Sequence, residues 1–322
     1  MGGRLAIHPA AASIFACLED STEWARWRAR KLEAYPASAA DLVVEVRDPR
    51  NLSTTEHAAL LERLLRANMA IYASPVGDDD PEIPLRVGAR LGLRTLDANP
   101  LAGEGGVTRI TADSAKAAAG YIPYTRGRML WHTDGYYNAP PTRVRSMLLH
   151  CVRPAAEGGE TALLDHEIAW LLLRETDPRL VRALMDPEAL TIPERRDEDG
   201  VARPAVTGPV FAVEPDTGDL HARFTARRRS IEWKCDATVS EAAARLLAIL
   251  DGDTPYVLRT RLEAGMGLVC NNVLHARSTF SDAAGAPRLL FRARFVERIA
   301  GTEGAWADLA RGSSGPQGRT YT

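Results

Sequence analysis

Apolar side chains recur with two different periods along the first hundred residues. From Thr54 to Asn68 they return every three or four positions behind a Ser-Thr-Thr-Glu start, the pattern of an amphipathic helix with a capping box. Two more helices are predicted at Trp24–Glu33 and Pro84–Leu96. Short strands are predicted at Leu42–Arg47 and Met69–Ala73. This part of the chain is therefore expected to alternate helices with strands.

Beyond Val107 the pattern changes to short apolar runs separated by glycine and proline. Strands are predicted at Val144–Val152, Thr161–Leu164, Val210–Glu214, Leu220–Thr225, Tyr256–Arg261, Leu268–His275 and Leu289–Glu297, and helices at Glu167–Glu175 and Glu241–Leu250. The run Asp216-Thr217-Gly218-Asp219 is typical of a hairpin turn. Many short strands with helices outside them favour a mainly β fold with helical additions, a double-sheet jelly roll.

The segment Pro178–Pro209 is polar, rich in proline and without a clear period. Such a segment suits either a lid over a site or an excursion across the surface. We expect an N-terminal extension of helices and strands over residues 1–60 and a β domain over 61–297, with an insertion at about 176–209. Residues 298–322 are expected to form a loosely held tail.

Composition and charge limit the partners that the chain can have. Its 322 residues carry 40 basic and 42 acidic side chains, for a net charge of −2. This balance argues against nucleic acid or an anionic membrane as a partner. Four cysteines without a CxxC pair predict reduced thiols, and no apolar run has the roughly 20 residues of a membrane span. We therefore expect a cytoplasmic protein, and a homo-oligomer, that acts on a small molecule.

Candidate chemistry begins at Trp131-His132-Thr133-Asp134-Gly135. Residues two apart on a strand point to the same face, so His132 and Asp134 can reach one metal ion together. His275, at the end of an apolar run late in the chain, suits a third ligand from an opposing strand. Two imidazoles and a carboxylate on one face of an octahedron suit Fe(II) and leave positions open for a co-substrate and O₂. Zn(II) is the alternative metal, although it usually takes four-coordinate sites.

Two further residues, in the same order along the chain, reinforce this interpretation. Arg288 lies on the next predicted strand after His275. Its guanidinium can bind the distal carboxylate of a keto-diacid whose other end chelates iron. The hydroxyl of Thr161, which follows Gly158-Gly159-Glu160, can donate to the same carboxylate. Alone, each would be an ordinary surface arginine or strand threonine.

Together these residues resemble the TauD/TfdA family of 2-oxoglutarate dioxygenases from about residue 60 to 297, and within it the γ-butyrobetaine hydroxylase branch. The likeness is strongest in Tyr124–Asp165 and Cys270–Arg294. It implies a double-stranded β-helix. It also implies iron ligands and residues for 2-oxoglutarate, which are His132, Asp134 and His275 for the metal and Thr161 and Arg288 for the co-substrate.

The same likeness indicates the class of substrate. Tyr124 matches an aromatic residue that encloses a trimethylammonium group in the γ-butyrobetaine branch, but Gly135 and Arg294 stand where that branch has aromatic residues. An arginine in the wall would repel a quaternary ammonium, so carnitine synthesis is not expected. Arg292 matches a position that binds sulfonate in taurine-type members, and it shares strand parity with Arg288 and Arg294.

The three arginines on this strand are expected either to face one cavity or to form a solvated strand end. One of Tyr136 and Tyr137 is expected to line the pocket, because neighbouring residues alternate faces. The run Arg227-Arg228-Arg229 can add a cation. A small anionic substrate, a carboxylate or a sulfonate, is therefore expected. His150 lies in an apolar strand and is expected to be a core histidine.

The resemblance implies a dioxygenase that uses Fe(II), 2-oxoglutarate and O₂ to hydroxylate its substrate, cleaving it where the new hydroxyl adjoins a heteroatom, with release of succinate and CO₂. Two alternatives stay open. One is a jelly-roll hydrolase or isomerase that holds zinc in the same three ligands and has no need of Arg288. The other is a non-catalytic binding protein of the same fold, against which the intact set of ligands argues.

Overall fold

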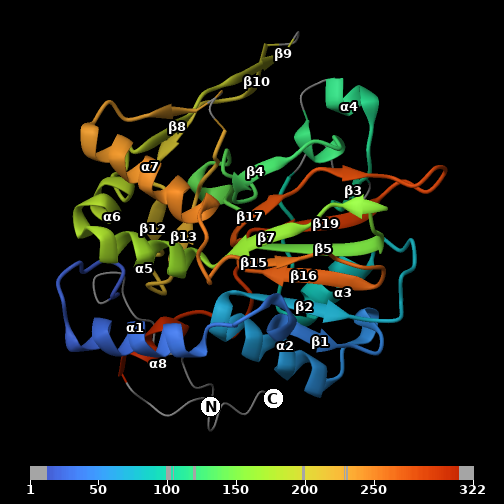
Figure 1. Cartoon of the computed structure of the whole chain (residues 1–322), viewed down its shortest axis with the longest axis horizontal. Coiled ribbons are helices and arrows are strands. Elements are labelled where there is room, and N and C mark those ends of the chain that lie inside the picture. The colour runs from blue at the N-terminus through green and yellow to red at the C-terminus, as the bar shows by residue number, and fades with distance from the viewer. Residues whose placement is uncertain are drawn as a thin grey trace.

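The computed structural model describes residues 13–98, 103, 105–118, 121–197, 200–227, 229 and 231–311. Two sheets form its centre (Figure 1). The larger has six strands in the order β1 (Val43–Glu45), β2 (Met69–Ala73), β16 (Met266–Cys270), β5 (Ser146–Arg153), β19 (Leu289–Phe295) and β3 (Thr108–Ile110). The smaller has four in the order β15 (Leu258–Thr260), β7 (Thr161–Leu164), β17 (Leu274–Arg277) and β4 (Met129–His132).

Apolar side chains from both sheets join one core cluster, as the alternating strands predict. Met147 and Leu268 enter it from the six-stranded sheet, and Leu164 and Leu274 from the four-stranded sheet. This mixed, strand-rich arrangement with helices outside is the expected jelly roll. His150 is fully buried with its Nδ1 2.9 Å from the Tyr72 hydroxyl, which confirms the expected core histidine.

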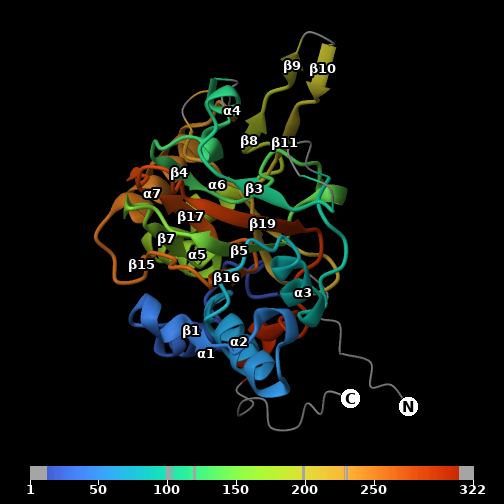
Figure 2. The ribbon, with the colours of Figure 1, turned by 90° about the vertical axis from the view of Figure 1, so that its right-hand side faces the viewer.

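Helices cover the sheets on two sides. The longer ones are α1 (Thr22–Ala34), α2 (Thr54–Ala67), α3 (Ile83–Arg90), α5 (His166–Thr176), α6 (Pro178–Leu184), α7 (Ala237–Asp251) and α8 (Ala305–Arg311). Figures 1 and 2 show α1 and α2 at the bottom of the molecule, below the sheets. Within the described part of the chain, no helix is both long enough and apolar enough to span a membrane.

The predicted start of α2 is confirmed, whereas the predicted end of α3 is wrong. The hydroxyl of Ser53 accepts from the Glu56 backbone N–H and the Glu56 carboxylate accepts from Ser53, so α2 begins with the expected capping box. The helix predicted at Pro84–Leu96 ends earlier, at Arg90, because the chain turns at Gly92 with φ of +79°.

A buried ion cluster ties α1 to the end of β7. The Lys31 ammonium lies 2.6 Å from Asp165 and 2.7 Å from Glu167, and its side chain is 1% exposed. Asp165 is also the N-cap of α5, since its carboxylate accepts from the backbone N–H of Glu167. A charge buried this deeply needs its partners, so the cluster fixes how α1 docks on the strands.

The segment predicted as a lid or a surface excursion is more regular than its composition indicated. Its first part is α6, whose Leu180, Val181 and Leu184 are buried. The rest forms strands β8 (Leu190–Ile192), β9 (Arg195–Asp197), β10 (Gly200–Arg203) and β11 (Val206–Gly208). Figures 1 and 2 both show the β9–β10 hairpin projecting from the end of the molecule opposite α1 and α2.

Two sequence-based predictions of local structure were wrong. Leu268–His275 was predicted as one strand but is two, β16 and β17, which belong to different sheets. The break falls at Asn272, whose φ of +49° turns the chain out of one sheet and into the other. The tail expected after residue 298 includes α8, which packs against α1, so its described part is not loosely held.

Candidate metal centre

Two neighbouring strands bring the three predicted ligands together. His132 ends β4, His275 lies on β17, and the two are register partners across the ladder. Asp134 follows two residues after His132, in a turn beyond the strand. One ligand atom from each residue can be chosen such that all three lie within 4.8 Å of one another. The spacing predicted from the sequence therefore produces one compact cluster.

Backbone carbonyls orient both imidazoles. The Nδ1 of His132 lies 2.8 Å from the carbonyl oxygen of Leu130, and the Nδ1 of His275 lies 2.9 Å from that of Val273. Each Nδ1–H donates to its carbonyl, which leaves the Nε2 lone pair of each ring available to a metal.

The charge state of the cluster suits a divalent cation. Burial and the neighbouring His275 lower the pKa of His132 to about 3, and burial lowers the pKa of His275. Burial raises the pKa of Asp134, but the guanidinium groups of Arg292 and Arg294 outweigh it and hold that pKa well below its usual range. Two neutral imidazoles and an ionised carboxylate are the forms that bind metal.

One oxygen of the Asp134 carboxylate is free to bind a metal. Its Oδ1 accepts from Arg292 at 3.1 Å, whereas its buried Oδ2 has no hydrogen-bond partner among the described residues. A buried carboxylate oxygen without a donor is rare in folded proteins. Together with the two free Nε2 atoms it fits a metal held by two histidines and one carboxylate.

Asn272 clamps the backbone of Asp134. Its Nδ2 donates to the carbonyls of Asp134 at 2.9 Å and Val144 at 2.7 Å, and its Oδ1 accepts from the backbone N–H of Asp134 at 2.8 Å. This role of Asn272 was not predicted. A doubled asparagine directly after a buried strand was the available signal, because asparagine tolerates the left-handed turn found here.

A cavity opens between the two sheets beside the cluster. Thr161 from β7, His275 from β17 and Arg288, directly before β19, all line it. Its apolar wall comes from both sheets and consists of Ile110, Met129, Met147, Leu149, Ala276 and Leu290. The structure thus brings Thr161 and Arg288 to one cavity with a candidate metal ligand, as the sequence predicted.

Arg288 is a buried cation without an ion pair in the described part of the chain. It is 8% exposed, and burial lowers its pKa. The carboxylate that acts on it, Asp282, pairs with Arg126 at 2.9 Å. Burying an unpaired charge is costly, so this place suits a bound anion.

The alternative of a solvated strand end is wrong for Arg288, which directly precedes β19, and for the two arginines within β19. Arg288 and Arg292 are each 8% exposed and both line the cavity, and Arg294 is 5% exposed. Arg294 turns instead to Asp97, with which it forms an ion pair, and donates to the Tyr137 hydroxyl at 3.0 Å. Two of the three therefore face the cavity, and Arg294 is not among its lining residues.

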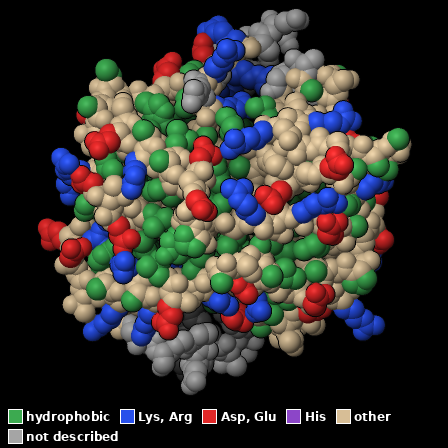
Figure 3. Space-filling model, viewed as in Figure 1, with side chains coloured by type: hydrophobic (Ala, Val, Ile, Leu, Met, Phe, Trp, Pro, Cys, Tyr) green, Lys and Arg blue, Asp and Glu red, His purple; other side chains and the backbone are tan. Residues whose placement is uncertain are grey.

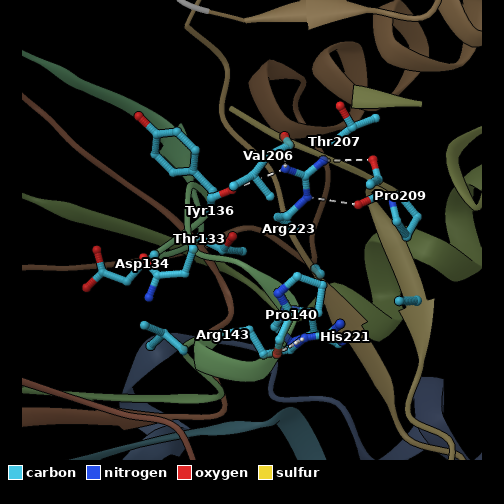
Figure 4. Close-up of a pocket in the computed structure, with 16 residues that line it drawn as sticks. Thr133, Asp134, Tyr136, Pro140, Arg143, Val206, Thr207, Pro209, His221 and Arg223 are labelled. Atoms are coloured by element: carbon cyan, nitrogen blue, oxygen red, sulfur yellow. Dashed lines mark hydrogen bonds between the residues drawn. The ribbon is translucent and has the colours of Figure 1, made fainter. Parts of the chain in front are cut away.

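The predicted aromatic residues lie in two places, Tyr124 and Tyr137 under the influence of Arg294 and Tyr136 in a second hollow. Tyr124 is buried, and the charges of Arg292 and Arg294 oppose the effect of burial, which raises its pKa. Tyr136 lines a second hollow that also contains Asp134 (Figure 4). Tyr136 therefore lines this hollow, and its place in a substrate pocket stays a prediction.

The second hollow depends on an arginine that the sequence did not single out. Arg223 donates to the carbonyls of Tyr136 at 3.3 Å, Pro209 at 3.2 Å and Gly208 at 2.7 Å (Figure 4). It thereby fastens the segment before β12 (Phe211–Val213) to the turn that follows Asp134. An arginine directly after a short strand gives no signal in the sequence for this role.

The run of three arginines is only partly described. Arg227 is half-buried and Arg229 is exposed, whereas Arg228 lies outside the described residues. Arg227 follows closely on Thr225, which forms a β-bridge with His132. The run therefore begins beside the metal cluster.

Comparison with known proteins agrees with this site. Residues 29–294 match the family model described as taurine catabolism dioxygenase TauD, TfdA family. A uridine-5'-phosphate dioxygenase of Amycolatopsis sp is 35% identical over 178 residues, which are 54% of this chain and 62% of that protein. Another from Streptomyces sp is 34% identical over 189 residues, covering 57% of this chain and 67% of that protein. The match thus spans about two thirds of each relative's length.

Solved structures share the fold at low identity. The crystal structure of asparagine oxygenase superposes with a TM-score of 0.55 at 15% identity, over 86% of this chain and 91% of that one. The likeness supports the jelly-roll architecture alone. Because the family model covers most of the chain, and includes all three residues of the metal cluster, the protein belongs to the TauD/TfdA family of dioxygenases.

Proposed function

We propose that this protein is an Fe(II)- and 2-oxoglutarate-dependent dioxygenase acting on a small, nucleotide-like phosphate. The observation that carries the proposal is the buried, unpaired Arg288, which shares a cavity with Thr161 and His275. A dicarboxylate that reached the metal at one end would meet a guanidinium and a hydroxyl at the other. A zinc hydrolase with the same three ligands would not need this guanidinium and hydroxyl.

Each residue of the centre has a distinct part in this proposal. His132, Asp134 and His275 would hold Fe(II) on one face. When bound, the iron supplies the activation of O₂ that couples oxidation of a substrate C–H bond to conversion of 2-oxoglutarate into succinate and CO₂. Arg288 and Thr161 would orient the co-substrate, and the apolar wall would exclude water from the reacting groups.

Asp134 needs a neighbouring cation to stay ionised in a buried site. Arg292 supplies it at 3.1 Å, and Arg294 adds a second positive charge. A metal would take over part of this neutralisation, because it would bring its own charge to the carboxylate. Arg292 would then be available to a polar group of the substrate in the cavity that it lines.

The substrate class comes from the two relatives, both uridine-5'-phosphate dioxygenases. It agrees with the small anionic substrate expected from Arg292 and Arg294. The predicted likeness to the γ-butyrobetaine branch has no support among these relatives, and the ion pair of Arg294 with Asp97 leaves that wall polar rather than aromatic. Tyr124, Tyr136 and Tyr137 are proposed as the aromatic part of the substrate pocket.

Turnover of 2-oxoglutarate tests the proposal. Purified protein is incubated with Fe(II), 2-oxoglutarate and air, and succinate is measured with uridine 5'-phosphate, taurine or γ-butyrobetaine as substrate. We expect succinate to rise with uridine 5'-phosphate and to depend on Fe(II) and O₂, with no rise in Asp134→Ala. Equal succinate in that variant would contradict the metal site. A response to taurine or γ-butyrobetaine alone would contradict the substrate class.

A further inference from the structure

Two arginines face each other across the β9–β10 hairpin. Arg195 and Arg203 are direct register partners of its ladder. Like charges placed opposite one another destabilise a strand pair. Burial lowers the pKa of Arg203, and the charge of Arg195 lowers it further. Neither has an ion pair in the part of the chain that the structure describes, so the hairpin holds a repulsion that a bound anion would relieve.

Aromatic rings hold both guanidinium groups over the body of the protein. The Arg195 guanidinium lies 4.7 Å from the ring centre of Tyr121, which follows helix α4 (Ser114–Ala118). The Arg203 guanidinium lies 5.6 Å from the ring centre of Tyr137 and donates to the carbonyl of Pro193 at 2.6 Å. Arg195 therefore contacts the segment after α4, and Arg203 contacts the segment that carries Asp134.

A third arginine approaches from the strand next to the metal cluster. The backbone N–H of Ala226 donates to the carbonyl of Trp131 at 2.7 Å, which fixes Arg227 beside β4. Arg227 is half-buried and, like the hairpin pair, forms no ion pair with a described residue. Burial raises the pKa of Tyr136, and the positive charges of Arg227 and Arg203 both oppose that shift.

The hairpin lies at the end of the molecule where the metal cluster's strand β4 is found. In Figures 1 and 2 the hairpin and α4 stand at the same end of the molecule, beyond β4. Figure 3 shows Lys and Arg side chains gathered at that end, over the hairpin. Many other arginines of the protein are paired with acids, as Arg109 is with Asp79 and Arg126 with Asp282.

We propose that Arg195, Arg203 and Arg227 form a binding subsite for the phosphate monoester of the substrate, between Tyr121 and Tyr137. This inference rests on the proposed function and names the part of the site that selects a nucleotide over a nucleoside. A phosphate monoester carries about −1.5 to −2 charges at neutral pH and three acceptor oxygens. It matches several guanidinium groups, whereas a carboxylate is satisfied by one.

Binding of uridine 5'-phosphate and of uridine, measured by calorimetry without O₂ and without turnover, tests the subsite. Arg195→Ala is the cleanest variant, because no described hydrogen bond of its guanidinium holds the fold. Arg203→Ala is compared with it after its unfolding temperature is measured. Arg196→Ala is the matched control, since Arg196 is on the same strand but pairs with Glu194 at 2.6 Å.

Each of the two test variants should weaken uridine 5'-phosphate binding by about ten- to a hundredfold, as expected for hydrogen bonds to a charged group. Uridine binding should stay unchanged, and Arg196→Ala should behave as the wild type with both ligands. Equal weakening of both ligands, or no weakening of the nucleotide, would overturn the subsite. So would a wild-type protein that binds uridine as tightly as its phosphate.

The binding data also separate this inference from the proposed function. A wild type that prefers the nucleotide and loses that preference in Arg195→Ala supports the subsite, even where no succinate is formed. In that case the proposed dioxygenase activity fails alone. Succinate formation that depends on uridine 5'-phosphate but is indifferent to Arg195→Ala and Arg203→Ala would support the function and overturn the subsite.

Discussion

Replacing Arg288 by methionine should weaken 2-oxoglutarate binding without weakening the fold. Arg288 is 8% exposed, lines the cavity with Thr161 and has no ion pair among the described residues. Two hydrogen bonds to a carboxylate contribute about 1.5–3 kcal/mol each. Their loss should cost about 3 kcal/mol or more, which raises the Kd for 2-oxoglutarate at least about a hundredfold.

Stability provides the second readout for this variant. Removing an unpaired buried cation should leave the unfolding temperature of the 2-oxoglutarate-free protein unchanged or raise it. Arg277→Met is the matched comparison. Its guanidinium is also buried beside the cavity but donates to the carbonyls of Thr125 at 2.8 Å and Gly127 at 2.6 Å. Loss of these bonds should destabilise the protein by about 2 kcal/mol.

Titration calorimetry of 2-oxoglutarate into the metal-loaded, anaerobic protein, with thermal unfolding alongside it, distinguishes the outcomes. Wild-type affinity in Arg288→Met would refute the assignment of this residue to the co-substrate. A fall in unfolding temperature as large as that of Arg277→Met would show instead that Arg288 has a structural role.

Three further predictions concern the framework of the site. Asn272→Ala should destabilise the protein by about 2–3 kcal/mol in urea unfolding, because the clamp on Asp134 loses three buried hydrogen bonds; an unchanged midpoint would contradict the clamp. Lys31→Met should cost about 3–5 kcal/mol, since it leaves buried carboxylates unpaired, and a neutral effect would show that the cluster is solvated. Burial lowers the pKa of His150 to about 4 from 6.5. The unfolded chain therefore binds the proton more tightly, so the contribution of His150 to the free energy of unfolding is fully present above pH 6.5 and is lost as the pH falls toward 4. Between pH 7.5 and pH 5 this residue should change the free energy of unfolding in urea by about 2 kcal/mol. The change should disappear in His150→Leu.

Local patterns predicted the elements of the fold well where the signal lay within one element. The capping box of α2, the bounds of β2 and β7 and the hairpin between β12 and β13 (Leu220–Ala222) all agree with the sequence. These features depend on neighbours in the chain. The break at Asn272 could not be predicted, because the apolar run continues across it and only pairing to two different sheets reveals the turn.

The candidate site was predicted by the order of its residues rather than by their surroundings. The likeness to the family brought His132, Asp134, Thr161, His275 and Arg288 into one hypothesis, and the structure brings them to one region. The burial of the arginines in and next to β19 depends on the segments that cover them, and the periodicity of the sequence does not predict those contacts.

Contacts between distant parts of the chain could not be predicted from local sequence patterns either. The opposition of Arg195 and Arg203 follows from the register of a hairpin whose strands were not predicted. The packing of α8 on α1 joins the two ends of the described chain. The cytoplasmic location, the homo-oligomer and the domain boundaries stay predictions.

The metal and co-substrate site can be tested most directly by an anaerobic titration. Stoichiometric Fe(II) is added to the purified protein, followed by 2-oxoglutarate, and the weak visible charge-transfer band of the iron–2-oxoglutarate complex is recorded. We predict that the wild type forms the band and that His275→Ala does not, because one of the three ligands is missing. Absence of the band in the wild type, or an equal band in His275→Ala, would contradict the assignment of His132, Asp134 and His275 as the iron ligands.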